Sequence, residues 1–156
     1  MSASDVERRL VELGCELGSS PAPLGHYVRA VRTGDLVFTA GHGPMGASGE
    51  LAFRGQVGAE VTPEEARRAA QLCALACLAS VRDAVGDLDR VARVVKLLGF
   101  VNCAPGFTAT SAVMDGASEL LEAVFGARGV HARSAIGTSI LPLNMPVELE
   151  MVLELR

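Results

Sequence analysis

Apolar side chains occupy every second position of the last nine residues before the C-terminal arginine. One set is Val147, Leu149, Met151, Leu153 and Leu155. The intervening set includes Glu148, Glu150 and Glu154. Because successive side chains of a β-strand point to opposite faces of the sheet, this alternation predicts a strand over 146–155 with one buried and one polar face. A second strand is expected over 133–141, joined to the first by the segment LPLNMP.

The strongest local signal is the start of a helix after Thr62. Thr62 suits the N-cap, Pro63 suits the first helical position, and Glu65 completes a capping box. The helix is predicted over 63–85, ending at Gly86. Its inner face carries small side chains, which allow a helix to lie close to a sheet. They are Ala66, Ala69, Ala70, Cys73, Ala76 and Cys77.

The rest of the chain predicts two further helices, three further strands and one possible short strand. One helix is expected over 4–13, with Ser4 as N-cap and with Val6, Leu10 and Val11 at helical spacing. The other is expected over 111–125. Strands are expected over 27–31, 36–40 and 91–101, and a short one near 51–53. With 156 residues, this order predicts a single α+β domain in which helices cover one face of a sheet.

The composition excludes several classes of protein. The formal net charge is −4 and the arginines are scattered, so the clustered basic face of a nucleic-acid-binding protein is missing. The sequence shows neither a signal peptide nor an apolar run long enough to span a bilayer. Hydrophobic residues make up 49% of the chain, and burial against sister subunits is one way to hide such a surplus. We therefore expect a cytoplasmic protein that binds neither nucleic acid nor membrane.

Arg133 opens a strand that is otherwise uncharged, and two interpretations compete for it. It could form a structural ion pair with Glu148 or Glu150, since a buried guanidinium needs a partner. It could instead bind the carboxylate of a substrate, for which its planar donors are suited. Glu148 has two interpretations as well. It is either a solvated glutamate on the polar face of its strand or a general acid and base beside a bound ligand.

Other kinds of site have little support. The three histidines, His26, His42 and His131, lack metal-ligand spacing, and no metal is expected. Cys73 and Cys77 would share one helical face as small core residues. With Cys15 and Cys103 they show no disulfide framework, so the thiols are expected to be reduced. The glycine-rich stretch 41–49 is no phosphate-binding loop, and Ser134 lacks a nucleophile elbow.

The C-terminal region resembles the signature of the RidA/YjgF family, once called the L-PSP endoribonuclease family. The signature here is Ala132-Arg133-Ser134, then Leu141-Pro142, then Val147-Glu148-Leu149-Glu150. Three earlier segments, 23–28, 36–42 and 94–107, also resemble the family, so the likeness covers 20–155. The chain is similar to a longer subgroup, in which 1–18 would form an N-terminal helical extension to a single domain spanning 1–156.

The resemblance implies a chorismate-mutase-like α+β fold with a mixed sheet, assembled as a homotrimer with clefts between subunits. Active family members hydrolyse 2-imino and enamino acids to 2-keto acids and ammonia, without a metal or organic cofactor. Arg133 would bind the substrate carboxylate and Glu148 would activate water. The residues expected to line the substrate are Tyr27, Gly41, His42, Ser134 and Ala135.

The chain departs from the family pattern at three places. Ala40-Gly41-His42 stands where the family has Ser-Gly-Gln, and Ala135 stands where it often has Cys. The family's asparagine in the second helix has no clear counterpart, although Asp115 and Ser118 fall nearby. His42 could therefore be a second acid and base, or a satisfied histidine in a loop.

Two other functions compete with the deaminase. The same cleft could hold a small carboxylate or keto acid without turnover, as a sensor or scaffold. Retention of Arg133 and Glu148 favours the enzyme, and the changes at Ala40 and Ala135 favour the binding protein. RNA cleavage, suggested by the old family name, is disfavoured by the acidic charge and the scarcity of aromatic residues.

Overall fold

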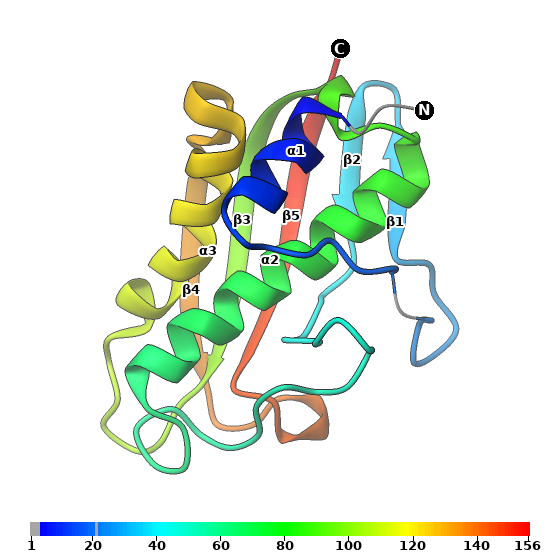
Figure 1. The fold of residues 1–156 in the computed structure, drawn as a ribbon. Helices are drawn as coiled ribbons and strands as arrows, with labels where there is room; N and C mark the ends of the chain where they lie inside the picture. Colours follow the sequence, from blue (N-terminus) through cyan, green and yellow to red (C-terminus); the bar gives the residue numbers. More distant parts are fainter. Residues whose placement is uncertain (1–3, 21) are drawn as a thin grey trace.

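The computed structural model describes residues 4–20 and 22–156, in which a five-stranded sheet is covered on one face by three helices (Figure 1). The helices are α1 (Asp5–Glu12), α2 (Pro63–Val85) and α3 (Thr110–Phe125). The strands are β1 (Ala30–Thr33), β2 (Leu36–Thr39), β3 (Val91–Asn102), β4 (Ala132–Thr138) and β5 (Val147–Leu155). Short 3₁₀ turns precede β3, follow α3 and lie between β4 and β5. The expected α+β class and element order are confirmed.

The sheet is mixed, with the strand order β1-β2-β5-β3-β4. β3 and β4 are parallel, whereas the β1–β2, β2–β5 and β3–β5 pairs are antiparallel. The crossover from β3 to β4 runs through α3, as a parallel connection requires. The last strand of the chain therefore lies in the middle of the sheet, where it pairs on both sides.

Helix α2 is the main cover of the sheet and packs on β5 and α3. Its start has the predicted capping box, in which Oγ1 of Thr62 accepts from the N–H of Glu65 and the Glu65 carboxylate accepts from the N–H of Thr62. It ends at Gly86, whose φ of 84° is in the left-handed region. The small residues of its inner face are all buried, as predicted. No helix in the described parts of the chain has the length and apolar character needed to cross a membrane.

The two faces of the sheet differ in what covers them. The apolar set of β5 is buried beneath the helices, and its glutamates lie half-buried on the other side. We call this other side the open face. Large apolar side chains remain exposed on it at Val31, Phe38 and Ile136. The alternation of apolar and polar residues thus correctly predicted a strand with one buried and one polar face.

Several element boundaries differ from the prediction. β1 begins at Ala30, and 27–29 belong to the preceding loop because pairing with β2 starts at Ala30. β4 ends at Thr138, opposite the last residue of its partner β3, where we expected it to reach 141. The segment 51–53 forms only an isolated bridge from Leu51 to Met45. In α1, Val6 and Leu10 are buried as expected, but Val11 is 73% exposed because it lies a quarter-turn away from their shared face.

Gly116 marks a close approach between α3 and α2. A Cβ added there would clash with the carbonyl oxygen of Arg67. We predict that Gly116→Ala destabilises the protein by about 1–2 kcal/mol, because overpacking outweighs the roughly 1 kcal/mol gained in helix propensity. The measurement is the free energy of unfolding in urea. Glu122→Ala, on the exposed side of the same helix, should change stability by less than about 0.5 kcal/mol. A stabilising Gly116→Ala would contradict the close approach.

Candidate functional site

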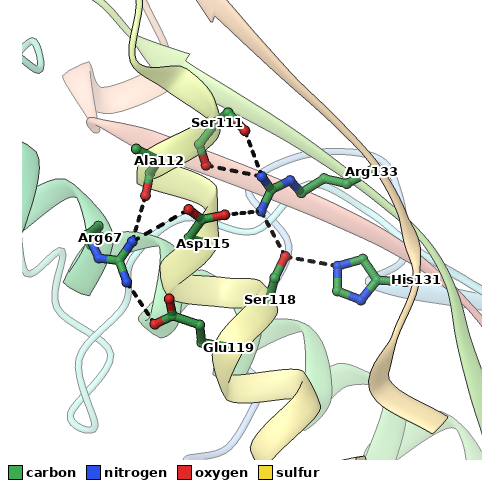
Figure 2. A network of polar contacts seen from close by, with 8 residues as sticks. All are labelled: Arg67, Ser111, Ala112, Asp115, Ser118, Glu119, His131 and Arg133. Atoms are coloured by element: carbon green, nitrogen blue, oxygen red, sulfur yellow. Dashed lines mark hydrogen bonds and ion pairs between the residues drawn. The ribbon is translucent and has the colours of Figure 1, made fainter. Parts of the chain in front are cut away.

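Arg133 lies on the edge strand β4, and its side chain reaches across to α3 (Figure 2). Its Nη1 donates to Oδ1 of Asp115 and to Oγ of Ser118, both at 2.9 Å. Its Nη2 donates to the carbonyl oxygen and to Oγ of Ser111, at 3.1 and 2.8 Å. The side chain is only 18% exposed. A guanidinium this far from water needs acceptors and a counter-charge, and α3 supplies both.

The partners of Arg133 are themselves linked to α2. Oδ2 of Asp115 lies 3.8 Å from Nη1 of Arg67, and Nη2 of Arg67 lies 2.7 Å from the Glu119 carboxylate. On the other side, the Oγ of Ser118 lies 3.0 Å from Nε2 of His131. Figure 2 shows this network running from β4 through α3 to α2. It contains two guanidinium groups and two carboxylates, so its charges balance.

One of the two interpretations of Arg133, a structural ion pair with Glu148 or Glu150, is wrong. β3 separates β4 from β5 in the sheet. Arg133 lies opposite Leu97 of β3, which is fully buried under the helices. Glu148 lies opposite Phe100, three residues further along β3 and therefore on the other face. Arg133 and Glu148 of one chain thus lie on opposite faces of the sheet.

Glu148 lies half-buried on the open face, against the backbone of Gly41. A Cβ at Gly41 would clash with Oε1 of Glu148, so a glycine is what leaves room for the carboxylate. Burial, and then the neighbouring charge of Glu150, raise the pKa of Glu148 above its ordinary value. A raised pKa brings a carboxylate closer to neutral pH, where it can both take and return a proton.

The ring of His42 faces the core, away from Glu148. The backbone of His42 pairs with that of Leu149 on β5, and its side chain is 1% exposed. Nδ1 lies 2.7 Å from the carbonyl oxygen of Ala40, to which it donates, and Nε2 accepts from the hydroxyl of Ser80 on α2 at 2.7 Å. Burial is the main cause that lowers the pKa of His42 to about 4. This geometry fits a neutral, satisfied histidine.

The remaining predicted residues are spread over both faces. Ser134 is on the open face, where its Oγ accepts from Nζ of Lys96 at 3.3 Å. Ala135 is on the helix side, and its carbonyl accepts from Oγ1 of Thr110 at 3.1 Å. Tyr27 is a partly exposed loop residue, and its hydroxyl accepts from the N–H of Leu24 at 3.3 Å. The fold therefore brings Gly41 to Glu148, and Asp115 and Ser118 to Arg133, but keeps these two groups apart.

Ser111 and Arg67 belong to the Arg133 network but were not predicted from the sequence. A signal for Ser111 was present, since Ser111, Asp115 and Ser118 have the spacing i, i+4 and i+7 and so share one face of α3. Arg67 gave no such signal, because it lies on another helix whose packing angle the sequence does not reveal.

Cys73 and Cys77 behave as core residues. Both are fully buried on α2, and their thiols donate to the carbonyl oxygens of Val147 and Leu149 at 3.5 and 3.4 Å. Burial raises the pKa of both thiols. Among residues 4–20 and 22–156, no group of three or more His, Cys, Asp or Glu side chains is arranged to hold a metal ion.

Comparison with known proteins identifies the family. The family model described as "YjgF/chorismate mutase-like, putative endoribonuclease" matches residues 7–155. The chain belongs to this family. It is 41% identical to protein TCP17 of Trypanosoma cruzi, over the whole chain and 98% of that protein. The resemblance drawn from the signature around Arg133 and Glu148 is thus confirmed.

Two solved structures superpose over almost the whole chain. One is a protein of unknown function from Agrobacterium tumefaciens, 41% identical, with a TM-score of 0.92 over 97% of this chain and 93% of that one. The other is from Shewanella oneidensis and carries the same endoribonuclease description. It is 33% identical, with a TM-score of 0.93 over 96% of this chain and 99% of that one.

The buried His42 makes stability depend on pH in a definite direction. Its folded pKa of about 4 lies below the unfolded value near 6.5, so the unfolded chain binds more protons between these values. We predict that stability falls as pH drops from about 6.5 to about 4, by up to about 3 kcal/mol from this residue. His42→Gln, whose amide can still bond Ser80, should remove this part of the loss.

The measurement is urea unfolding of both proteins at several pH values from about 7 to about 4.5. His26→Gln, in an exposed loop, is the matched control and should keep the pH dependence of the wild type. An equally steep loss in His42→Gln would show that other groups cause it.

Proposed function

We propose that this protein hydrolyses 2-imino and enamino acids to 2-keto acids and ammonia, in a cleft between copies of a homotrimer. Arg133 binds the substrate carboxylate, and Glu148 positions and activates the attacking water. The observation that carries the proposal is the placement of Glu148. It is a half-buried carboxylate with a raised pKa, held against Gly41 on an uncovered sheet face.

The chemistry needs little more than a positioned water and a proton acceptor. Water adds to the electrophilic carbon of the protonated imine, Glu148 takes a proton from the water, and the carbon–nitrogen double bond becomes single, which leaves a neutral amino group. Glu148 then returns its proton to the nitrogen. The hydroxyl passes its proton to Glu148 as the carbonyl forms, the carbon–nitrogen bond breaks, and ammonia leaves. Glu148 then releases this proton to solvent, which balances the proton that the imine carried. One imino acid and one water give one keto acid and one ammonia.

The positions of the two groups favour an inter-subunit site. Because Arg133 and Glu148 of one chain lie on opposite faces of the sheet, one substrate can contact both only if they come from different copies. The apolar side chains on the open face supply a reason to associate. Phe38 is 42% exposed there, and Val31 and Ile136 are also exposed. A trimer is the assembly that the family resemblance implies.

The open face is a poor surface for RNA. Glu148, Glu150 and Glu154 all lie on it, and the chain as a whole has a formal charge of −4. Binding to a phosphate backbone depends on clustered Lys and Arg, and acidic side chains repel it. The proposal therefore takes the small-molecule reaction over the RNA cleavage named in the family description.

Imine hydrolysis is the direct test of the proposal. An amino-acid oxidase generates 2-iminopropanoate and 2-iminobutanoate in situ, and loss of the imine is followed by trapping with semicarbazide. We predict that the wild type accelerates hydrolysis. Arg133→Ala should lower kcat/KM by about 10- to 100-fold, since charge-assisted hydrogen bonds are lost. Glu148→Gln should lower kcat by roughly 100-fold or more through loss of the base.

Two outcomes would contradict the deaminase. If the wild type binds a keto acid without accelerating hydrolysis, the protein is a binding module. If Glu148→Gln retains full turnover, Glu148 does not activate water. Gly43→Ala, which crowds Met145 and not Glu148, is a control for Gly41→Ala, which crowds Glu148. Only the latter should lower kcat.

The assembly can be tested at the open face. We predict that the wild type sediments as a trimer and that Phe38→Asp dissociates it, because a charge would replace apolar surface buried between copies. Val11→Asp is the control, since Val11 is exposed on α1, on the helix side of the molecule, and this variant should remain assembled. A monomeric wild type would remove the shared cleft, and with it the proposed reaction.

A further inference from the structure

We propose that Asp115 is a positioning residue for Arg133, and that with Ser111 and Ser118 it turns the guanidinium so that a carboxylate binds through its side edge, at Nε and Nη2. This inference rests on the proposed function, in which Arg133 binds the substrate carboxylate. It adds a residue that acts through Arg133 and a defined mode of binding.

Both terminal nitrogens of Arg133 are bonded to residues of α3. Nη1 is occupied by Asp115 and Ser118, and Nη2 is bonded twice to Ser111. The end of the guanidinium, between its two terminal nitrogens, therefore faces α3 (Figure 2). Within the described residues, no hydrogen bond uses Nε of Arg133. A carboxylate that approaches the side edge accepts a hydrogen bond from Nε and replaces Ser111 as an acceptor at Nη2. Asp115 stays in place on Nη1.

Asp115 lies between two guanidinium groups. Arg67 places Nη1 within 3.8 Å of Oδ2 of Asp115 and donates from that same atom to the carbonyl oxygen of Ala112. The two oxygens of Asp115 thus serve two guanidinium groups, one on β4 and one on α2. The contact to Arg67 is an ion pair too long for a hydrogen bond, so the carboxylate is restrained by its 2.9 Å bond to Arg133 and by the charge of Arg67, although its side chain is 45% exposed. A restrained acceptor limits the rotation of Arg133, whose long side chain would otherwise have many rotamers.

The charges of the cluster offset one another. Because Asp115 and Glu119 offset Arg133 and Arg67, the cluster has little net charge to attract anions. Affinity for a carboxylate must then come from the direction of the N–H groups and not from charge alone. The affinity of Arg133 for a carboxylate therefore depends on the orientation of its guanidinium. Asp115 sets that orientation.

Four variants, compared with the wild type, test the inference. Asp115→Ala should raise KM for 2-iminobutanoate by about tenfold, because the guanidinium loses its restrained partner, while kcat changes by less than about twofold. Asp115→Asn keeps the Oδ1 acceptor without the charge and should restore KM to within about threefold of the wild type. Ser118→Ala removes one acceptor and should raise KM by about two- to threefold. Glu122→Gln changes an exposed carboxylate on the same helix that lies outside this network, and should leave KM unchanged.

Binding of 2-oxobutanoate, measured by calorimetry, separates the proposed role of Arg133 from the proposed role of Asp115. Thermal unfolding checks that each variant is folded. If the wild type does not bind, or Arg133→Ala binds equally well, the proposed function fails. If Arg133→Ala alone loses binding while folded Asp115→Ala binds like the wild type, only the role of Asp115 fails. Equal weakening by Asp115→Ala and Asp115→Asn would also overturn it, since charge and not positioning would be the cause. If Asp115→Ala does not fold, Asp115→Asn and Ser118→Ala decide. The inference is overturned if Asp115→Asn raises KM more than about 10-fold over the wild type, or if Ser118→Ala leaves KM unchanged.

Discussion

The close packing of α2 on β5 is the constraint on which the rest of the structure depends. Small residues let the helix approach until the thiols of Cys73 and Cys77 reach the carbonyl oxygens of Val147 and Leu149. Burying Val147 and Leu149 on this side fixes which face of β5 the intervening glutamates occupy, because a strand alternates its side chains. The position of Glu148 is thus a consequence of how a helix packs on the opposite face of the sheet.

The same packing places the glycine beside Glu148. His42 is tied to α2 through Ser80 and to β5 through two backbone hydrogen bonds with Leu149. Its neighbour Gly41 is therefore held at the level of Glu148, with no Cβ to displace the carboxylate. His42 thus takes no part in the proposed chemistry, but it helps to set the position of Glu148, which does.

Much of the fold could be predicted from local patterns. The capping box at Thr62, the stop at Gly86 and the alternation in β5 are encoded within a few residues, and each appears where expected. The ends of β1 and β4 could not be predicted in this way, because they are set by where the partner strands begin and end. The site followed the same division. Arg133 and Glu148 were singled out as charges in an apolar region, but the hydrogen bonds that join Arg133 to Ser111, Asp115 and Ser118 were not predicted.

The sequence by itself determined which residues are unusual and which side of each element is apolar, since those properties depend on side-chain type and spacing. Only the tertiary structure decided that Arg133 bonds Asp115 and not a glutamate of β5, because strand order places β3 between them. It also decided that Arg133 and Glu148 lie on opposite faces of one sheet. Strand order and helix packing result from contacts between distant segments, which local spacing does not specify.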